Sequence, residues 1–260
     1  MIRLALVQFP RQARDRKSNA GRMAGYLAGC APADIVLLPE DWMGPGVIDW
    51  PEYLSAVRKL AKALPAGSLL VSGAQYTRTP EGVFSRGLFL GPAGEAVFEK
   101  RFPSRAVGER GFVRPGRFSP VLEHRGVKVG AAVCVDLMYP ELVRHLALSG
   151  AQVILSPANI PADRLDLWRA LGLVRAAENT VFVAVANNTA TAYGDGRPVE
   201  GGSFVARPYG HGFASAGSGE GIHFFEIDPE EITAARKRWP YLDDIQELRN
   251  RSTSQQPDCP

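Results

Sequence analysis

The chain has 260 residues, of which 45% are hydrophobic and 22% are charged, a composition that excludes a disordered or fibrous protein. Its 30 basic and 27 acidic residues leave a net charge of +3. They are spread along the chain, so nothing indicates binding to nucleic acid or to an anionic membrane surface.

Several kinds of site and location are excluded by simple counts. The apolar stretches are too short to span a membrane. Three cysteines and four histidines, without metal-ligand spacing, predict neither a disulfide framework nor a metal site. The N-terminal segment lacks the long apolar region of a signal peptide, so we expect a cytoplasmic protein.

Short apolar segments alternate with amphipathic ones along the first part of the chain. Helices are predicted over residues 15–28 and 51–64, the second with Pro51 in its first turn. The strands expected here are residues 2–9, 34–38, 68–76, 84–90 and 95–98.

The second half continues the same alternation. Helices are predicted over 140–148 and 165–178. Strands are expected over 127–133, 153–156 and 180–187, followed by a Gly-rich, strand-like region to about residue 227. A short helix from Pro229 is expected to lead into a polar tail.

This alternation favours an α/β protein whose sheets are covered by helices. The glycine-punctuated strand pairs favour mixed sheets with hairpins, and no phosphate-binding glycine motif is present. Because no low-complexity linker interrupts the chain, we predict one domain over 1–260, with a core of about 1–228 and a C-terminal extension over 229–260.

Three reactive side chains follow predicted strands. Cys134 stands where a buried strand turns toward a helix, a position that favours a thiolate and an oxyanion site. Glu40 follows the strand in DIVLLPE, and Lys100 follows the strand in EAVFEK. Each residue alone is explained as well by a buried thiol or a solvated charge. Together they supply a nucleophile, a base and an oxyanion stabiliser.

The segments LLPEDW, VFEKRFP and GAAVCVDLMYPEL resemble the three signature segments of the nitrilase superfamily, the carbon–nitrogen hydrolases. Their order and separation match the Glu–Lys–Cys triad of that family. IRLALVQF resembles its first strand, and the segment around Glu109 resembles the one that carries a second glutamate. RAAENT and Asn187 resemble the segment where helix meets strand behind the site.

The resemblance implies an αββα sandwich, commonly dimerised into a four-layer αββα–αββα assembly. It implies that Cys134 attacks an amide or nitrile carbon, that Lys100 and the Val135 N–H stabilise the oxyanion, and that Glu40 transfers protons. Glu109 would position the substrate and tune Lys100. No cofactor or metal is implied.

Two neighbours of the nucleophile depart from the family pattern. Val135 replaces a common aromatic residue, and Met138 replaces an arginine often found there. Any substrate carboxylate bound at position 138 is therefore in doubt. The stretch that contains Asn159 resembles one that often lines the substrate pocket.

Four functions are compatible with these residues. We favour a small-molecule amidase that acts through a thioester, and the triad serves equally for a nitrilase. A cysteine–histidine hydrolase using His145 or His211 lacks a matching signature around Cys134. A non-catalytic binding module would be expected to have lost one of the three triad residues.

We also expect a homodimer. The two helices predicted in the second half carry more apolar residues than one buried helix face requires. Part of the surface of these helices is therefore predicted to meet a second subunit. These residues are Leu142, Leu146, Leu167, Trp168 and Leu171.

Overall fold

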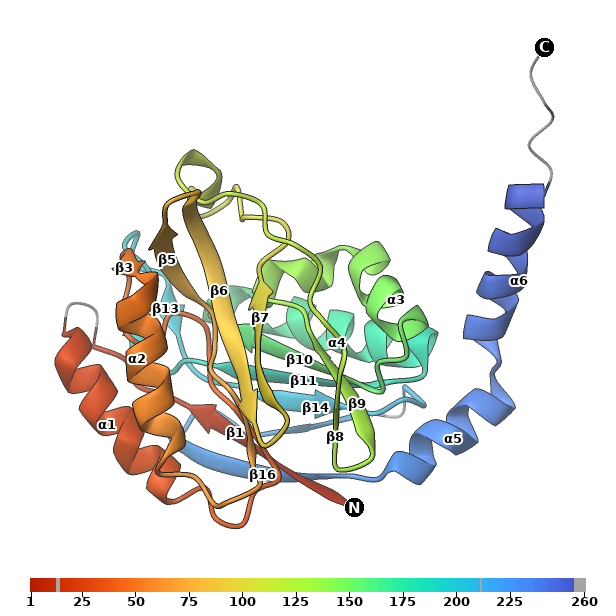
Figure 1. The fold of residues 1–260 in the computed structure, drawn as a ribbon, viewed down its shortest axis with the longest axis horizontal. Helices are drawn as coiled ribbons and strands as arrows, with labels where there is room; N and C mark the ends of the chain where they lie inside the picture. Colours follow the sequence, from red (N-terminus) through yellow and green to blue (C-terminus); the bar gives the residue numbers. More distant parts are fainter. Residues whose placement is uncertain (13–14, 211, 255–260) are drawn as a thin grey trace.

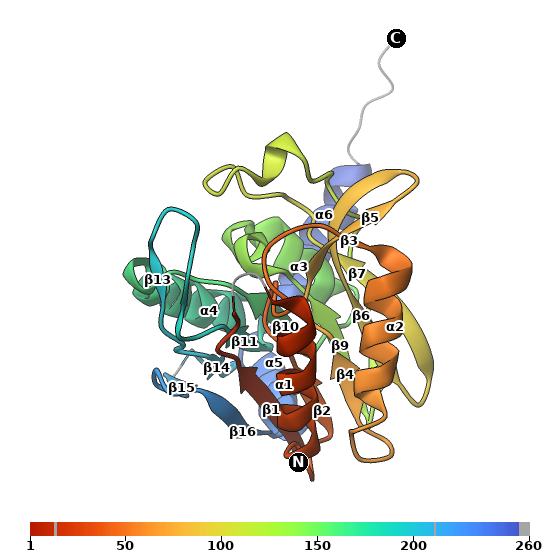
Figure 2. The ribbon, with the colours of Figure 1, turned by 90° about the vertical axis from the view of Figure 1, so that its left-hand side faces the viewer.

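The computed structural model describes residues 1–12, 15–210 and 212–254. They form two β-sheets packed face to face with helices on both outer faces (Figures 1 and 2). The predicted αββα sandwich is thereby confirmed. Within the described ranges, no helix is both long and apolar enough to cross a bilayer.

One sheet has eight strands, and in its central part β1, β2 and β4 run parallel. In spatial order its members are β16 (Gly221–Ile227), β1 (Ile2–Gln8), β2 (Ile35–Leu37), β4 (Leu69–Val71), β6 (Gly82–Gly91), β5 (Gln75–Thr79) and β3 (Ile48–Asp49), with β7 (Gly94–Glu99) also paired to β6.

The other sheet has six strands, and β9, β10 and β11 in it run parallel. In spatial order its members are β15 (Phe213–Ser215), β14 (Phe204–Ala206), β11 (Phe182–Asn187), β10 (Val153–Ala158), β9 (Val127–Ala131) and β8 (Leu122–His124). A separate hairpin of β12 (Thr191–Ala192) and β13 (Pro198–Val199) follows β11.

The strands of the first sheet are apolar on both faces because each face packs against a different layer. In β1, Leu4 and Leu6 face the second sheet, whereas Ala5 and Val7 pack under the helices α1 (Arg16–Ala28) and α2 (Trp50–Ala61). This alternation follows from the two-residue period of a strand. On the far side, α3 (Pro140–Leu148) and α4 (Leu165–Asn179) cover the second sheet (Figure 1).

The strand expected over residues 68–76 is wrong in its extent, since β4 and β5 are separate. Gly73 lies between them with φ 76°, and a Cβ atom there would lie 2.2 Å from the carbonyl oxygen of Pro39. Only glycine permits both the dihedral angle and this close approach. The break lets the loop after β2, which carries Glu40, pack against the first sheet.

The polar segment expected after the helix at Pro229 is helical over most of its length. After α5 (Pro229–Arg238), a second helix, α6 (Tyr241–Ser254), contacts α3 and α4 and extends away from the sandwich (Figure 1). Asp243 and Asp244 lie in its first turn and Arg251 in its last, an arrangement that complements the helix dipole. The helix carries too few apolar residues to be recognised from periodicity.

Candidate active site

The residues predicted to be functional lie at the carboxyl ends of strands from both sheets. Glu40 follows β2 and Lys100 follows β7 of the eight-stranded sheet, whereas Cys134 follows β9 and Asn159 follows β10 of the six-stranded sheet. Parallel strands bring their carboxyl ends to one edge, where sites of α/β proteins form. The site therefore spans the contact between the two sheets.

Hydrogen bonds hold the two halves of this site together. The backbone N–H of Glu40 donates to the carbonyl oxygen of Ala158, 3.2 Å away. The side-chain amide of Asn188 donates to the Glu40 carbonyl oxygen at 2.7 Å and to the Asn159 side-chain oxygen at 2.9 Å. Glu40 is thus fixed by groups of the opposite sheet.

Cys134 opens a 3-10 turn over Cys134–Met138 and has the left-handed backbone angle φ 47°. Such an angle is uncommon outside glycine and marks a functional or strained position. Its side chain is 7% exposed. The Glu40 carboxylate and the backbone N–H of Asn159 are near enough to the thiol to shift its pKa.

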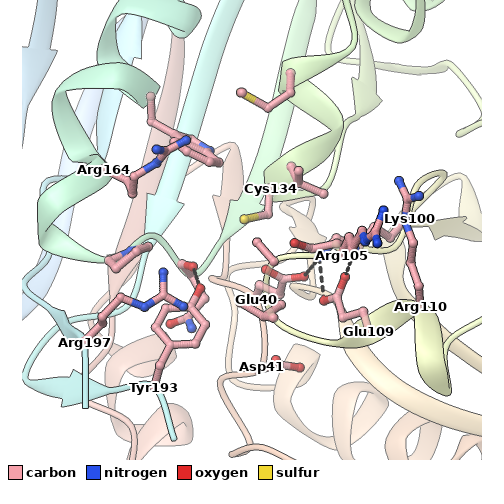
Figure 3. A pocket seen from close by; sticks show the side chains of 18 of the residues that line it. Glu40, Asp41, Lys100, Arg105, Glu109, Arg110, Cys134, Arg164, Tyr193 and Arg197 are labelled. Atoms are coloured by element: carbon pink, nitrogen blue, oxygen red, sulfur yellow. Dashed lines mark hydrogen bonds and ion pairs between the residues drawn. The ribbon is translucent and has the colours of Figure 1, made fainter. Parts of the chain in front are cut away.

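Lys100 bridges two carboxylates. Its Nζ lies 2.8 Å from Glu40 Oε1 and 2.7 Å from Glu109 Oε1 (Figure 3). Glu109 also accepts hydrogen bonds from the Tyr76 hydroxyl, 2.7 Å away, and from the Ser104 backbone N–H. All three charged side chains are buried, and a buried charge is tolerated only when it is paired in this way.

Burial and neighbouring charges shift the proton affinities of these groups. Burial raises the pKa of Glu40, and the ammonium of Lys100 offsets part of that rise. Burial would lower the pKa of Lys100, but the carboxylates of Glu40 and Glu109 outweigh it and hold that pKa well above its ordinary value. Lys100 is therefore an ammonium at neutral pH.

The Cys134 thiol differs from the sequence-based expectation. Burial, followed by the negative charge of Glu40, raises the pKa of this thiol well above its ordinary value. At neutral pH the resting group is therefore a thiol that keeps its proton. The expectation that the strand-end turn favours a thiolate is therefore wrong, and the proton has to move to a base when the sulfur attacks.

These groups line a cavity of about 450 Å³, a size typical of a small-molecule site. All six residues predicted from the sequence line it: Glu40, Lys100, Glu109, Cys134, Val135 and Asn159. None of the histidines in the described ranges does, and the ring of His145 instead lies against Phe118. His211 lies outside the described residues.

Sequence reasoning missed Asp41, which also lines the cavity and is buried. It has the left-handed angle φ 52°, and its carboxylate lies 3.9 Å from the guanidinium of Arg11. Burial and the charge of Glu40 raise the pKa of Asp41 well above its ordinary value. A polar residue beside another acid in a loop gives no sequence signal of burial.

Further missed residues come from segments far apart in the chain. They line the cavity wall and mouth, and they are Tyr76, Ser104, Arg105, Arg110, Asp163, Arg164, Trp168, Tyr193 and Arg197. Within the ranges that the structure describes, no group of three or more His, Cys, Asp or Glu side chains is placed to bind a metal ion.

The model of the family described as carbon–nitrogen hydrolase matches residues 3–237. This chain belongs to the carbon–nitrogen hydrolase family. The match covers both sheets, their four covering helices and every residue assigned to the site from the sequence. The protein is thus a carbon–nitrogen hydrolase of the nitrilase superfamily, as the three signature segments indicated.

Similar carbon–nitrogen hydrolases include proteins named as amidases. A 2-oxoglutaramate amidase of Bacillus subtilis is 30% identical over 224 residues, covering 82% of this chain and 85% of that protein. Omega-amidase YafV of Escherichia coli K12 is 29% identical over 266 residues, covering 95% and 98%. The structure of XC1258 from Xanthomonas campestris, described as a CN-hydrolase superfamily protein, matches with a TM-score of 0.85 at 25% identity, covering 94% and 96%.

Proposed function

We propose that this carbon–nitrogen hydrolase is a small-molecule amidase, which converts an amide and water into a carboxylic acid and ammonia or an amine. Two kinds of observation support the proposal. Relatives that align with most of the chain are named as amidases. The cavity is lined by a thiol, a carboxylate and an ammonium, and the last two form an ion pair.

In the first half of the proposed reaction, Cys134 attacks the amide carbon while its proton passes to Glu40. The carbonyl oxygen becomes an oxyanion, which Lys100 and the Val135 N–H stabilise. Val135 is the second residue of a 3-10 turn, where the first N–H groups have no partner within the turn. Glu40 then gives the proton to the leaving nitrogen, and the carbon–nitrogen bond breaks.

In the second half, water attacks the thioester on Cys134. Glu40 accepts a proton from the water, and the second oxyanion is stabilised by the same donors. Collapse releases the carboxylic acid, and the proton held by Glu40 returns to the sulfur. Glu109 acts through Lys100, because its Oε1 lies 2.7 Å from Nζ and holds the ammonium in place.

The observation that carries this proposal is the ion pair of Lys100 Nζ with Glu40 Oε1 at 2.8 Å in the cavity that Cys134 also lines. We test it with Cys134→Ser and Cys134→Ala, assayed by ammonia release from amides and an aliphatic nitrile. Loss of the nucleophile should lower turnover more than about a hundredfold while the fold is kept. Activity above about a hundredth of wild type would contradict the assignment.

The proposed assembly is a homodimer of single-domain subunits, in which residues 229–260 extend a core of about 1–228. Three of the apolar residues expected to meet a second subunit, Leu142, Leu146 and Trp168, are instead buried within the subunit. The support comes instead from exposed apolar side chains on α4 and α6: Leu167, Val174, Tyr241 and Leu248. Light scattering that finds a 28.1 kDa monomer at micromolar concentration would contradict this assembly.

We also propose a cytoplasmic location. The cysteines in the described ranges, Cys30 and Cys134, are both free and buried. A reducing compartment keeps such thiols reduced, and the proposed nucleophile requires it. Fractionation of the source cells with an antibody against the protein tests this location.

A further inference from the structure

Four arginine side chains line the active-site cavity: Arg105, Arg110, Arg164 and Arg197. The carboxylates that line it are Glu40, Asp41, Glu109 and Asp163, of which the first three are buried at the catalytic centre and Asp163 is exposed. Positive charge therefore dominates the part of the cavity away from the nucleophile. A mouth of this charge attracts anions.

Two of these arginines are stacked on aromatic rings that also line the cavity. The guanidinium carbon of Arg164 lies 5.9 Å from the centre of the Trp168 ring, and that of Arg197 lies 4.9 Å from the centre of the Tyr193 ring. Stacking uses the face of a guanidinium and leaves the N–H groups in its plane able to bind a carboxylate. In Arg197 the Nε and Nη2 groups already bind Asp195, so Nη1 is the group that remains for a ligand.

The stacked arginines are also held in place by their backbone and by their neighbours. Arg197 is in the β12–β13 hairpin, and Asp195 binds its guanidinium at 2.9 Å. The Tyr193 hydroxyl in the same hairpin donates to the backbone oxygen of Asn159, which follows β10. Arg164 precedes α4, whose Trp168 is 8% exposed. The Arg197 guanidinium is thus oriented before any ligand binds, whereas in the described part of the chain the Arg164 guanidinium is held by the Trp168 ring alone.

The positions of the labelled residues decide which part of a substrate would reach these arginines. In Figure 3, Arg164, Tyr193 and Arg197 lie on one side of Cys134, whereas Lys100, Glu109 and Arg110 lie on the other. The leaving nitrogen has to face Glu40, which donates its proton. The acyl chain then points away from the Lys100–Glu109 pair, toward the wall that carries the two stacked arginines.

We infer that Arg164 and Arg197 form an anion subsite that binds a carboxylate at the far end of the substrate's acyl chain. The inference rests on the proposed amidase function and adds the residues that select the substrate. Met138 also lines the cavity, but its side chain is uncharged and cannot form an ion pair with a carboxylate. The substrate class is therefore an amide whose acyl part ends in a carboxylate.

The test compares two substrates that differ only at the far end of the chain, glutaramate and valeramide. We measure kcat and KM for wild type, Arg164→Gln, Arg197→Gln and the control Arg169→Gln. Arg169 lies in α4 and binds Asp166 at 3.2 Å but does not line the cavity. Each subsite variant should raise KM for glutaramate about tenfold or more and leave valeramide unchanged within about twofold. Arg197→Lys should restore part of the loss, and Arg169→Gln should behave as wild type.

A second readout does not depend on turnover. Glutarate should bind to Cys134→Ala in a calorimetric titration, and Arg197→Gln in that background should weaken its Kd about tenfold or more. Equal turnover of both amides by wild type, or equal losses for both in the variants, would overturn the inference and leave the amidase function standing. Binding of glutarate that depends on Arg197, without turnover of any amide, would support the subsite and contradict the amidase function.

Discussion

The side chain of Asp136 accepts a hydrogen bond from the backbone N–H of Arg101 at 2.9 Å, and its other oxygen accepts from Phe102 at the same distance. Asp136 is the second residue after Cys134, and Arg101 directly follows Lys100. One carboxylate therefore connects the turn of the proposed nucleophile with the strand end that carries the proposed oxyanion stabiliser.

Replacing Asp136 should disturb both stability and turnover. In Asp136→Ala, three backbone N–H groups, those of Arg101, Phe102 and Val133, lose their acceptor, which should lower the free energy of unfolding by about 2 kcal/mol or more. Because Lys100 is no longer tied to the Cys134 turn, kcat should fall about tenfold to a hundredfold. Urea unfolding and steady-state kinetics measure the two effects. Asp166→Ala, at a side chain that is 97% exposed, is the control and should change neither.

The roles of Glu40 and Lys100 are separable by the adduct that each variant accumulates. Glu40→Gln keeps the shape but cannot carry a proton, so it should stall water attack and trap a thioester on Cys134 with any substrate whose acylation is still possible, such as an ester whose leaving group departs without a proton. Lys100→Ala should slow acylation and deacylation together, because both pass through an oxyanion. Intact-mass spectrometry after mixing with such an ester should find an acyl adduct in Glu40→Gln and none in Lys100→Ala. Wild-type turnover in either variant would remove that residue from the site.

The dependence of kcat/KM on pH should change when the charge of Glu109 is removed. Burial raises the pKa of Glu40, Lys100 offsets part of that rise, and the negative charge of Glu109 adds to it. The base has to be deprotonated to accept the thiol proton. The acid limb of kcat/KM should therefore lie above the ordinary range of a glutamate, near 4.3. In Glu109→Gln, which lacks that charge, the pKa of Glu40 falls and the acid limb should move to lower pH. An unchanged limb, or a shift to higher pH, would contradict this coupling.

Gly73 should be intolerant of any side chain. Gly73→Ala places a Cβ atom 2.2 Å from the Pro39 carbonyl oxygen at a residue with φ 76°. Gly126→Ala is a matched control, because it has φ 78° and no atom within 4 Å of the added Cβ. The control should lose about 1–2 kcal/mol through backbone strain alone. Gly73→Ala should lose about 2 kcal/mol more and should also lower kcat, since Glu40 follows Pro39. If thermal unfolding shows that both variants lose the same stability, the close approach to Pro39 does not contribute to the effect of Gly73→Ala.

The sequence predicts the fold and the centre of the site because buried strands and reactive residues carry local signals. The run from Ile2 to Phe9 is apolar because both of its faces are covered, and Cys134 stands out as a thiol directly after such a strand. Gly73 ends β4 through a contact with the carbonyl of Pro39, which is distant in sequence. A local pattern therefore cannot reveal that break.

The wall of the cavity was not predictable for the same reason. Arg164 and Arg197 come from different elements, and each alone resembles any solvated arginine. The burial of Asp41 cannot be predicted from its neighbours in the sequence, because the residues that bury it are distant in the sequence and meet only in the folded chain. The helix α6 was missed because it packs with a few side chains against α3 and α4 instead of burying a continuous apolar stripe.

The proposed base and ammonium belong to one sheet and the proposed nucleophile to the other. Neither sheet alone holds a complete set of catalytic groups, so catalysis requires the two sheets to be docked in register. A partly folded state with each sheet formed but displaced would keep its secondary structure and hydrolyse nothing. On warming or in mild denaturant, activity should then be lost before circular dichroism detects any unfolding. The early loss would indicate that one sheet has shifted relative to the other.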